Sequence, residues 1–168
     1  MKQFDDIIDR LRQHFENVTV HPPADAAALH EVRKRVPGVS DVLLSFWRYC
    51  NGICVTRFEE GDLFGIDRSL SLYPLGNDAQ RLGRFVPLRG DGCGDYDSLV
   101  VGDGPYEGAV VFWDHEVFDG AAYLLGGSFY SHISICGQTT WFTSTCGTAR
   151  EIQNADLPNL MRSLARHT

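Results

Sequence analysis

Cys93 and His115 are the two side chains whose types and spacing could support nucleophilic catalysis. Cys93 stands between two glycines, where a thiol could be exposed, and His115 follows 22 residues later with an acidic residue on each side. A thiolate attacks acyl groups when a histidine takes its proton and a carboxylate orients that histidine. Small buried cysteines beside turns are common, so we expect both residues to be structural and the protein not to be an enzyme. A small Cys/His hydrolase is kept as an alternative.

The loop from Asp91 to Asp97 is the second candidate for chemistry, because its aspartates occupy positions 1, 5 and 7 as in a calcium loop. An EF-hand loop also needs an oxygen ligand at position 3, a glycine at position 6 and a glutamate at position 12. These positions hold Cys93, Tyr96 and Gly102 here. We therefore expect no metal site, and the glycines instead predict a tight turn with positive φ angles.

The distribution of acidic residues is the strongest signal for binding. The chain of 168 residues has a formal net charge of −7. Residues 1–50 hold 7 basic and 7 acidic side chains, whereas residues 51–125 hold 5 basic and 13 acidic ones. Phosphate-backbone binding depends on clustered Lys and Arg, so this balance excludes a nucleic-acid binder. An acidic segment either keeps a protein soluble or forms a surface for a basic partner.

The candidate partner contacts are acidic residues of segment 51–125 that fall in expected loops or at strand ends. They are Glu59, Glu60, Asp62, Asp67, Asp103, Glu107 and Glu116. Their grouping on one face of the protein is a hypothesis.

No segment predicts export or membrane insertion. The first residues lack a basic stretch followed by an apolar run and a cleavage site, and no window approaches the about 20 apolar residues that span a bilayer. The five cysteines are an odd number and form no Cys-x-x-Cys pair, so we expect thiols in a reducing compartment. These observations predict a cytoplasmic protein without a membrane partner and without a cofactor.

Three helices are expected in the first 50 residues. Apolar residues recur at helical spacing over residues 4–15, and a second helix is expected over 25–35, with a basic triplet at its C-terminal end. Ser40 or Asp41 can cap a third helix, which Asn51-Gly52 ends.

The middle of the chain changes to short apolar runs separated by turn residues, which predicts strands. The expected strands are Ile53 to Thr56, Leu63 to Ile66, Leu70 to Leu75, Arg84 to Leu88, Ser98 to Val101 and Ala109 to Trp113. Short links between them favour antiparallel neighbours. Ser128 can begin a further helix, the segment from Gly137 to Gly147 is expected to be an edge strand or a loop, and a last helix is expected to end at Ala165. This order of elements predicts an α+β fold in a single domain over residues 1–168.

Several strings of residues together resemble the SUKH superfamily, whose founding members include a fungal cell-wall assembly regulator. The strings are Leu44 to Ile53 after Pro37, Phe64-Gly65, Pro87 to Tyr96, and Gly108 to Glu116. One departure is that Val36-Pro37 stands where the family has Leu-Pro. The resemblance implies an α+β domain with a curved, mostly antiparallel sheet, against which N-terminal and C-terminal helices pack.

Many bacterial members of that superfamily are immunity proteins, made beside a polymorphic or contact-dependent toxin that they bind directly. The resemblance gives no motif for the toxin contacts, because these vary within the family. Trp47, Val110, Asn51-Gly52, Gly92 and Gly94 are expected to be structural. We therefore expect a non-enzymatic immunity or adaptor protein that neutralises a cognate toxin, such as a basic nuclease domain, by protein–protein interaction. A regulatory scaffold without a toxin is the other alternative, and the oligomeric state is left open.

Overall fold

The computed structural model describes residues 2–55, 62–75, 84–90, 92, 94–102, 107–113, 122–126 and 150–151. This part of the chain has an α+β fold, as expected. Its helices are α1 (Lys2–His14), α2 (Ala26–Arg35), α3 (Asp41–Tyr49) and α4 (Ile66–Leu72). Its strands are β1 (Thr19–Val20), β2 (Ile53–Cys54), β3 (Arg84–Gly90), β4 (Tyr96–Val101), β5 (Val110–Trp113), β6 (Ala122–Gly126) and β7 (Arg150–Glu151).

The first three helices form where their sequence signals predict them. In α1 the apolar stripe is buried against the core, with Ile7 and Leu11 each 1% exposed. Asp25 caps α2 by accepting a hydrogen bond from the Ala28 N–H at 2.7 Å. Ser40 caps α3 in the same way, from the Leu43 N–H at 3.2 Å. Both caps satisfy backbone donors that the first helical turn leaves unpaired.

The basic triplet that ends α2 contributes to the packing of its neighbours. The guanidinium of Arg33 lies 3.0 Å from the carboxylate of Asp41 at the start of α3. Arg35 donates to the carbonyl of Leu70 in α4 at 3.1 Å. The triplet therefore links α2 to both following helices, in addition to its favourable position at a helix C-terminus.

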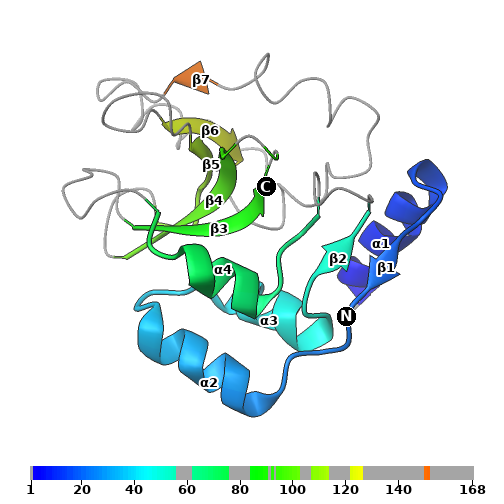
Figure 1. Ribbon diagram of the computed structural model, residues 1–168, viewed down its shortest axis with the longest axis horizontal. Helices are drawn as coiled ribbons and strands as arrows, with labels where there is room; N and C mark the ends of the chain where they lie inside the picture. Colours follow the sequence, from blue (N-terminus) through cyan, green and yellow to red (C-terminus); the bar gives the residue numbers. More distant parts are fainter. Residues whose placement is uncertain are drawn as a thin grey trace.

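The strands form two antiparallel sheets, one with the order β1-β2 and one with the order β3-β4-β5-β6-β7. All neighbouring strands pair antiparallel, as the short links predicted. Figure 1 shows α4 directly below β3, with α3 and α2 beyond it, and α1 beside the β1–β2 pair. Gly92 and Gly94, in the link between β3 and β4, have φ angles of 84° and 110°. These values lie in the left-handed region that glycine adopts without strain.

The central strands are buried on both faces. Val86, Leu99 and Val110 belong to the core that the helices also fill. Phe85, Val100 and Val111 alternate with them along the strands and are no more than 1% exposed. The strands therefore consist of nearly continuous apolar residues, without the clear alternation of a sheet that faces water.

The strands expected from Leu63 to Ile66 and from Leu70 to Leu75 are a wrong prediction. Leu63 makes only an isolated bridge to Ile53, and residues 66–72 form helix α4. Ile66, Ser69 and Leu70 are the buried residues of α4, at the spacing i, i+3 and i+4 that defines one helical face. The helix is short, so its periodicity is hard to tell from that of a buried strand.

The predictions for the C-terminal part fall largely outside the described residues. These are the helix expected after Ser128, the segment from Gly137 to Gly147 and the last helix to Ala165. Strands β6 and β7 are described but were not among the predicted strands. Within the described part of the chain, no helix is long and apolar enough to cross a membrane.

Candidate functional site

Two segments that are distant in the sequence meet at a packed contact between Asn51-Gly52 and Phe64-Gly65, called here the 51/65 junction. The Trp47 indole N–H, fully buried, donates to the carbonyl of Phe64 at 3.0 Å. The side-chain oxygen of Asn51 accepts from the Ile66 N–H at 2.8 Å and thereby caps α4. Residues 47–52 and 64–66 therefore stabilise one another, and their role in the described structure is architectural.

Two glycines make the 51/65 junction possible. Gly52 has a φ angle of +106°, and a Cβ atom on it would lie 2.8 Å from the Gly65 nitrogen. A Cβ atom on Gly65 would lie 2.4 Å from the Asn51 carbonyl oxygen. Real Cβ atoms do not approach backbone atoms this closely, so both positions require glycine, which has no Cβ atom.

Asp62 is buried, in contrast to what a partner contact needs. Its carboxylate accepts from the Val55 N–H at 2.7 Å, and the residue is 7% exposed. This buried carboxylate therefore stabilises the backbone around Val55 by a charge-assisted hydrogen bond. Asp62 is therefore a poor candidate for contact with another protein.

The remaining candidate contacts divide between described and other residues. Asp67, in the first turn of α4, and Glu107, in the turn before β5, are exposed. Glu59, Glu60, Asp103 and Glu116 lie outside the described residues. The described structure thus presents two of the seven acidic residues to solvent and buries a third.

A row of aromatic side chains, called here the aromatic row, joins α4 to the end of the large sheet. Tyr96 and Trp113 are register partners with stacked rings, whose centroids lie 6.2 Å apart. The ring of Phe64 meets Tyr96 edge-on with a centroid distance of 6.3 Å, and the Arg68 guanidinium lies 5.6 Å from the Phe64 ring centre. Tyr96 and Trp113 are half-buried, whereas Arg68 is exposed. The row carries aromatic and arginine side chains of the kinds enriched where proteins bind one another.

Gly90 leaves room for the aromatic row. It is the register partner of Tyr96, and a Cβ atom on it would lie 3.3 Å from the Phe64 ring and 3.4 Å from the Tyr96 ring. The two rings therefore meet over a position without a side chain. A glycine paired across strands with an aromatic residue is a common way to cover such a gap.

A buried ion pair joins β3 to β4 beside the aromatic row. Arg89 donates from Nε to the Asp97 carboxylate at 2.7 Å, and the two side chains are 5% and 0% exposed. Arg89 and Asp97 are register partners, next to the point where the β3–β4 register shifts. The pair therefore removes one positive and one negative charge of segment 51–125 from the surface and leaves the net charge of that segment unchanged.

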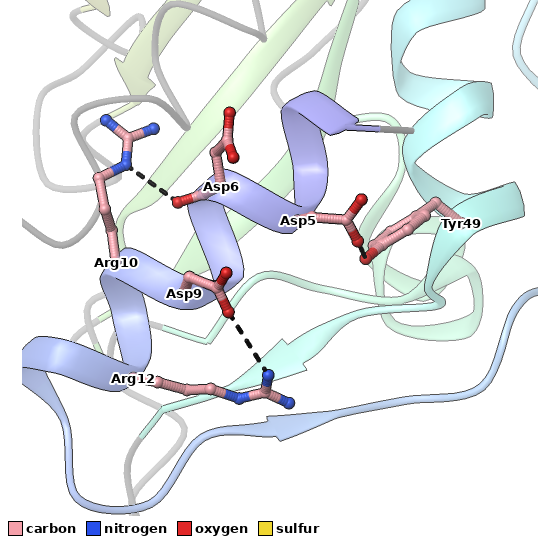
Figure 2. Close-up of polar contacts among 6 residues, drawn as sticks. All are labelled: Asp5, Asp6, Asp9, Arg10, Arg12 and Tyr49. Atoms are coloured by element: carbon pink, nitrogen blue, oxygen red, sulfur yellow. Dashed lines mark hydrogen bonds and ion pairs between the residues drawn. The ribbon is translucent and has the colours of Figure 1, made fainter.

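Helix α1 has a polar face of its own, shown in Figure 2. The Tyr49 hydroxyl donates to the carboxylate of Asp5 and so joins α3 to α1. This hydrogen bond, with some burial, raises the pKa of Tyr49 to about 12. Asp9 and Arg12 form an exposed ion pair at 3.7 Å, one turn apart. Contacts of that exposed kind contribute little to stability.

The Cys/His pair considered from the sequence cannot be placed, because Cys93 and His115 lie outside the described residues. A different pair is present: the His21 Nε2 atom lies 3.2 Å from the Cys54 Sγ atom. These residues are 33 positions apart, and no local spacing in the sequence connects them. Only the pairing of β1 with β2, which sets Thr19 opposite Cys54, brings them together.

Among the residues that the structure describes, no three His, Cys, Asp or Glu side chains gather where they could hold a metal ion.

A comparison with protein-family models finds no match to this chain, and a search of curated proteins finds none either.

Proposed function

We propose that the protein is a non-enzymatic immunity or adaptor protein that binds a basic protein toxin, such as a nuclease domain, and neutralises it through an acidic surface. The excess of acidic residues over 51–125 is the observation that carries the proposal. Asp62 and Asp97 are buried, and so is Arg89. Setting these three aside leaves 11 acidic against 4 basic side chains in the segment. The buried contacts of Asp62, Asp97 and Arg89 therefore do not cancel the negative charge of segment 51–125.

The charge fits a basic partner for a physical reason. A nuclease has a positively charged groove for phosphates, and an acidic protein can occupy that groove in place of the nucleic acid. Complementary charge of this kind raises association rates and disfavours wrong partners. Like charge also opposes association of the inhibitor with itself.

The aromatic row gives the acidic segment side chains suited to anchoring a partner. Asp67 precedes Arg68 in α4, so an exposed carboxylate stands beside the arginine that covers the Phe64 ring. Interfaces draw most of their affinity from a few aromatic and arginine residues, whereas surrounding charges steer the encounter. In this proposal the aromatic row anchors the toxin, and Asp67 and Glu107 belong to the steering charge.

The experiment pairs the chain with the toxin domain encoded beside its own gene. Expression of the toxin domain alone should stop growth, and co-expression with the full chain in the cytoplasm should restore it. The purified proteins should bind with an affinity that falls as salt increases, because exposed charges are screened. The proposal fails if the neighbouring genes encode no toxin, or if the chain neither binds the toxin domain nor restores growth.

Neutralising the two exposed candidate contacts, Asp67 and Glu107, tests whether the acidic charge steers binding. The double variant Asp67→Gln with Glu107→Gln should lower the association rate and flatten its salt dependence. The matched control is Glu16→Gln with Glu31→Gln, because these two exposed acids lie outside segment 51–125 and removing them changes the net charge equally. Equal effects of the two double variants would contradict a role for this segment. Binding to a host protein without any effect on a toxin would favour a regulatory scaffold instead.

A further inference from the structure

The contact between His21 and Cys54 lies on the exposed side of the β1–β2 pair. Ile53 is 1% exposed and points into the core, so the next residue along the strand, Cys54, points the other way. Its register partner Thr19 is exposed, and His21 lies two residues further along, on the same side as Thr19. The His21 N–H donates to the carbonyl of Gly52 at 3.1 Å, which continues the pairing past the end of β1. The backbone thus holds the two side chains together.

The contact has the geometry of an activated thiol. The thiolate is the reactive form of cysteine, and an imidazole within hydrogen-bond distance can take the thiol proton. Cys54 is half-buried and His21 is exposed, so the pair borders solvent. Access and a proton acceptor are the two conditions for selective thiol chemistry.

Cys50 is a nearby cysteine that lacks access to solvent. It lies four residues before Cys54 and is 0% exposed. Burial raises the pKa of the Cys50 thiol to about 11. A thiol that is both buried and hard to ionise reacts slowly, so Cys50 is an internal reference for Cys54.

We propose that Cys54, with His21 as its proton acceptor, is a thiol–disulfide exchange site for low-molecular-weight disulfides such as glutathione disulfide. The Cys54 thiolate attacks one sulfur of the disulfide, a new S–S bond forms to Cys54, and the original S–S bond breaks. The departing thiolate takes up the proton held on His21. Cys54 is thereby oxidised, and half of the small disulfide is reduced to a thiol. This site is independent of the proposed toxin surface.

The mixed disulfide can form without disturbing the core. Cys54 points away from the side of β2 on which Ile53 packs, so the attached group extends outward beside Thr19 and His21. The modification is therefore reversible surface chemistry, which a reducing agent removes.

The experiment treats the reduced, full-length protein with glutathione disulfide and follows each of its five cysteines by peptide mass mapping. At about pH 7, Cys54 should form the mixed disulfide at least about tenfold faster than Cys50. The proposal is overturned if Cys54 in the folded wild-type protein reacts no faster than Cys50. This comparison needs no variant, so it stands whatever a substitution does to folding.

A pair of histidine variants tests the role of His21. His21→Gln should slow the Cys54 reaction about fivefold or more at about pH 7, whereas the rates should converge at about pH 9.5, where solvent base forms the thiolate. His30→Gln is the matched control, because His30 is also exposed but lies on α2. Equal Cys54 rates in the two variants at about pH 7 would overturn the proton-acceptor role. A merely structural role would slow the reaction equally at both pH values.

Discussion

Arg89 and Asp97 form an ion pair at 2.7 Å between neighbouring strands, with both side chains almost completely removed from solvent. Burying two charges is costly, and their attraction offsets this cost only while both partners are present. The pair therefore makes the β3–β4 register sensitive to the loss of either residue.

Asp97→Asn should lower the free energy of unfolding by about 3 kcal/mol or more, because the guanidinium of Arg89 stays buried and loses its ion pair with Asp97. Urea denaturation measures the change. Asp41→Asn is the control, since it removes the exposed partner of Arg33 and should cost under about 1 kcal/mol. Similar losses in the two variants would show that the burial of the Arg89–Asp97 pair has no energetic consequence.

Asn51→Ala should destabilise the protein by about 1–2 kcal/mol, because the Ile66 N–H loses its acceptor and α4 loses its cap. Asn17→Ala removes an exposed asparagine and should change stability by no more than about 0.5 kcal/mol. Thermal denaturation of both variants measures the difference. A stable Asn51→Ala protein would mean that α4 does not depend on the 51/65 junction.

Gly65 and Gly108 should respond differently to substitution. A lack of space limits the residue at position 65, whereas the positive φ angle limits the residue at position 108. Gly65→Ala places a Cβ atom against the Asn51 carbonyl and should cost about 2–3 kcal/mol. Gly108 has a φ angle of +81° and open space around it, so Gly108→Ala should cost about 1 kcal/mol of backbone strain.

Asparagine distinguishes these two causes. Gly108→Asn should recover part of the loss, because asparagine tolerates the left-handed conformation, whereas Gly65→Asn should not. Unfolding free energies of the four variants provide the measurement. Recovery by asparagine at position 65 would contradict the close backbone contact.

Asp5→Asn should lower the pKa of Tyr49 from about 12 toward its ordinary value, because the carboxylate that holds the hydroxyl proton is gone. NMR titration of labelled tyrosine rings resolves Tyr49 from the other tyrosines. In the wild-type protein, the folded-state pKa is the higher one. The stability that this hydrogen bond contributes is therefore fully present below about pH 10 and is lost as the pH rises to about 12. A Tyr49 pKa that is the same in the variant would exclude the hydrogen bond as the cause.

Local signals in the sequence predicted some of these features well. The cap at Ser40 is an interaction within three residues of the chain, and a single amphipathic face defines α1. Such features depend on neighbouring residues only, so composition and spacing are sufficient to find them. The α+β order and the antiparallel pairing followed from the same kind of signal.

Contacts between distant residues could not be predicted in this way. Helix α4 has no side-chain cap of its own and is capped by Asn51, which lies 15 residues before Ile66. Its seven residues are too few for periodicity to distinguish a helix from a strand. The burial of Asp62 and the meeting of His21 with Cys54 depend likewise on how separate segments pack. For the candidate site, the sequence predicted the acidic segment but not which carboxylates reach solvent.

The 51/65 junction also determines where this chain could be recombined. A crossover placed between residues 55 and 62 would join Asn51-Gly52 of one parent to position 65 of the other, where any residue but glycine would bring a Cβ atom against the Asn51 carbonyl. Residues 2–55 therefore do not form an interchangeable building block, although they include three helices. Exchange of segments between related chains should succeed only where the parent that supplies residues 64–66 also has glycine at position 65.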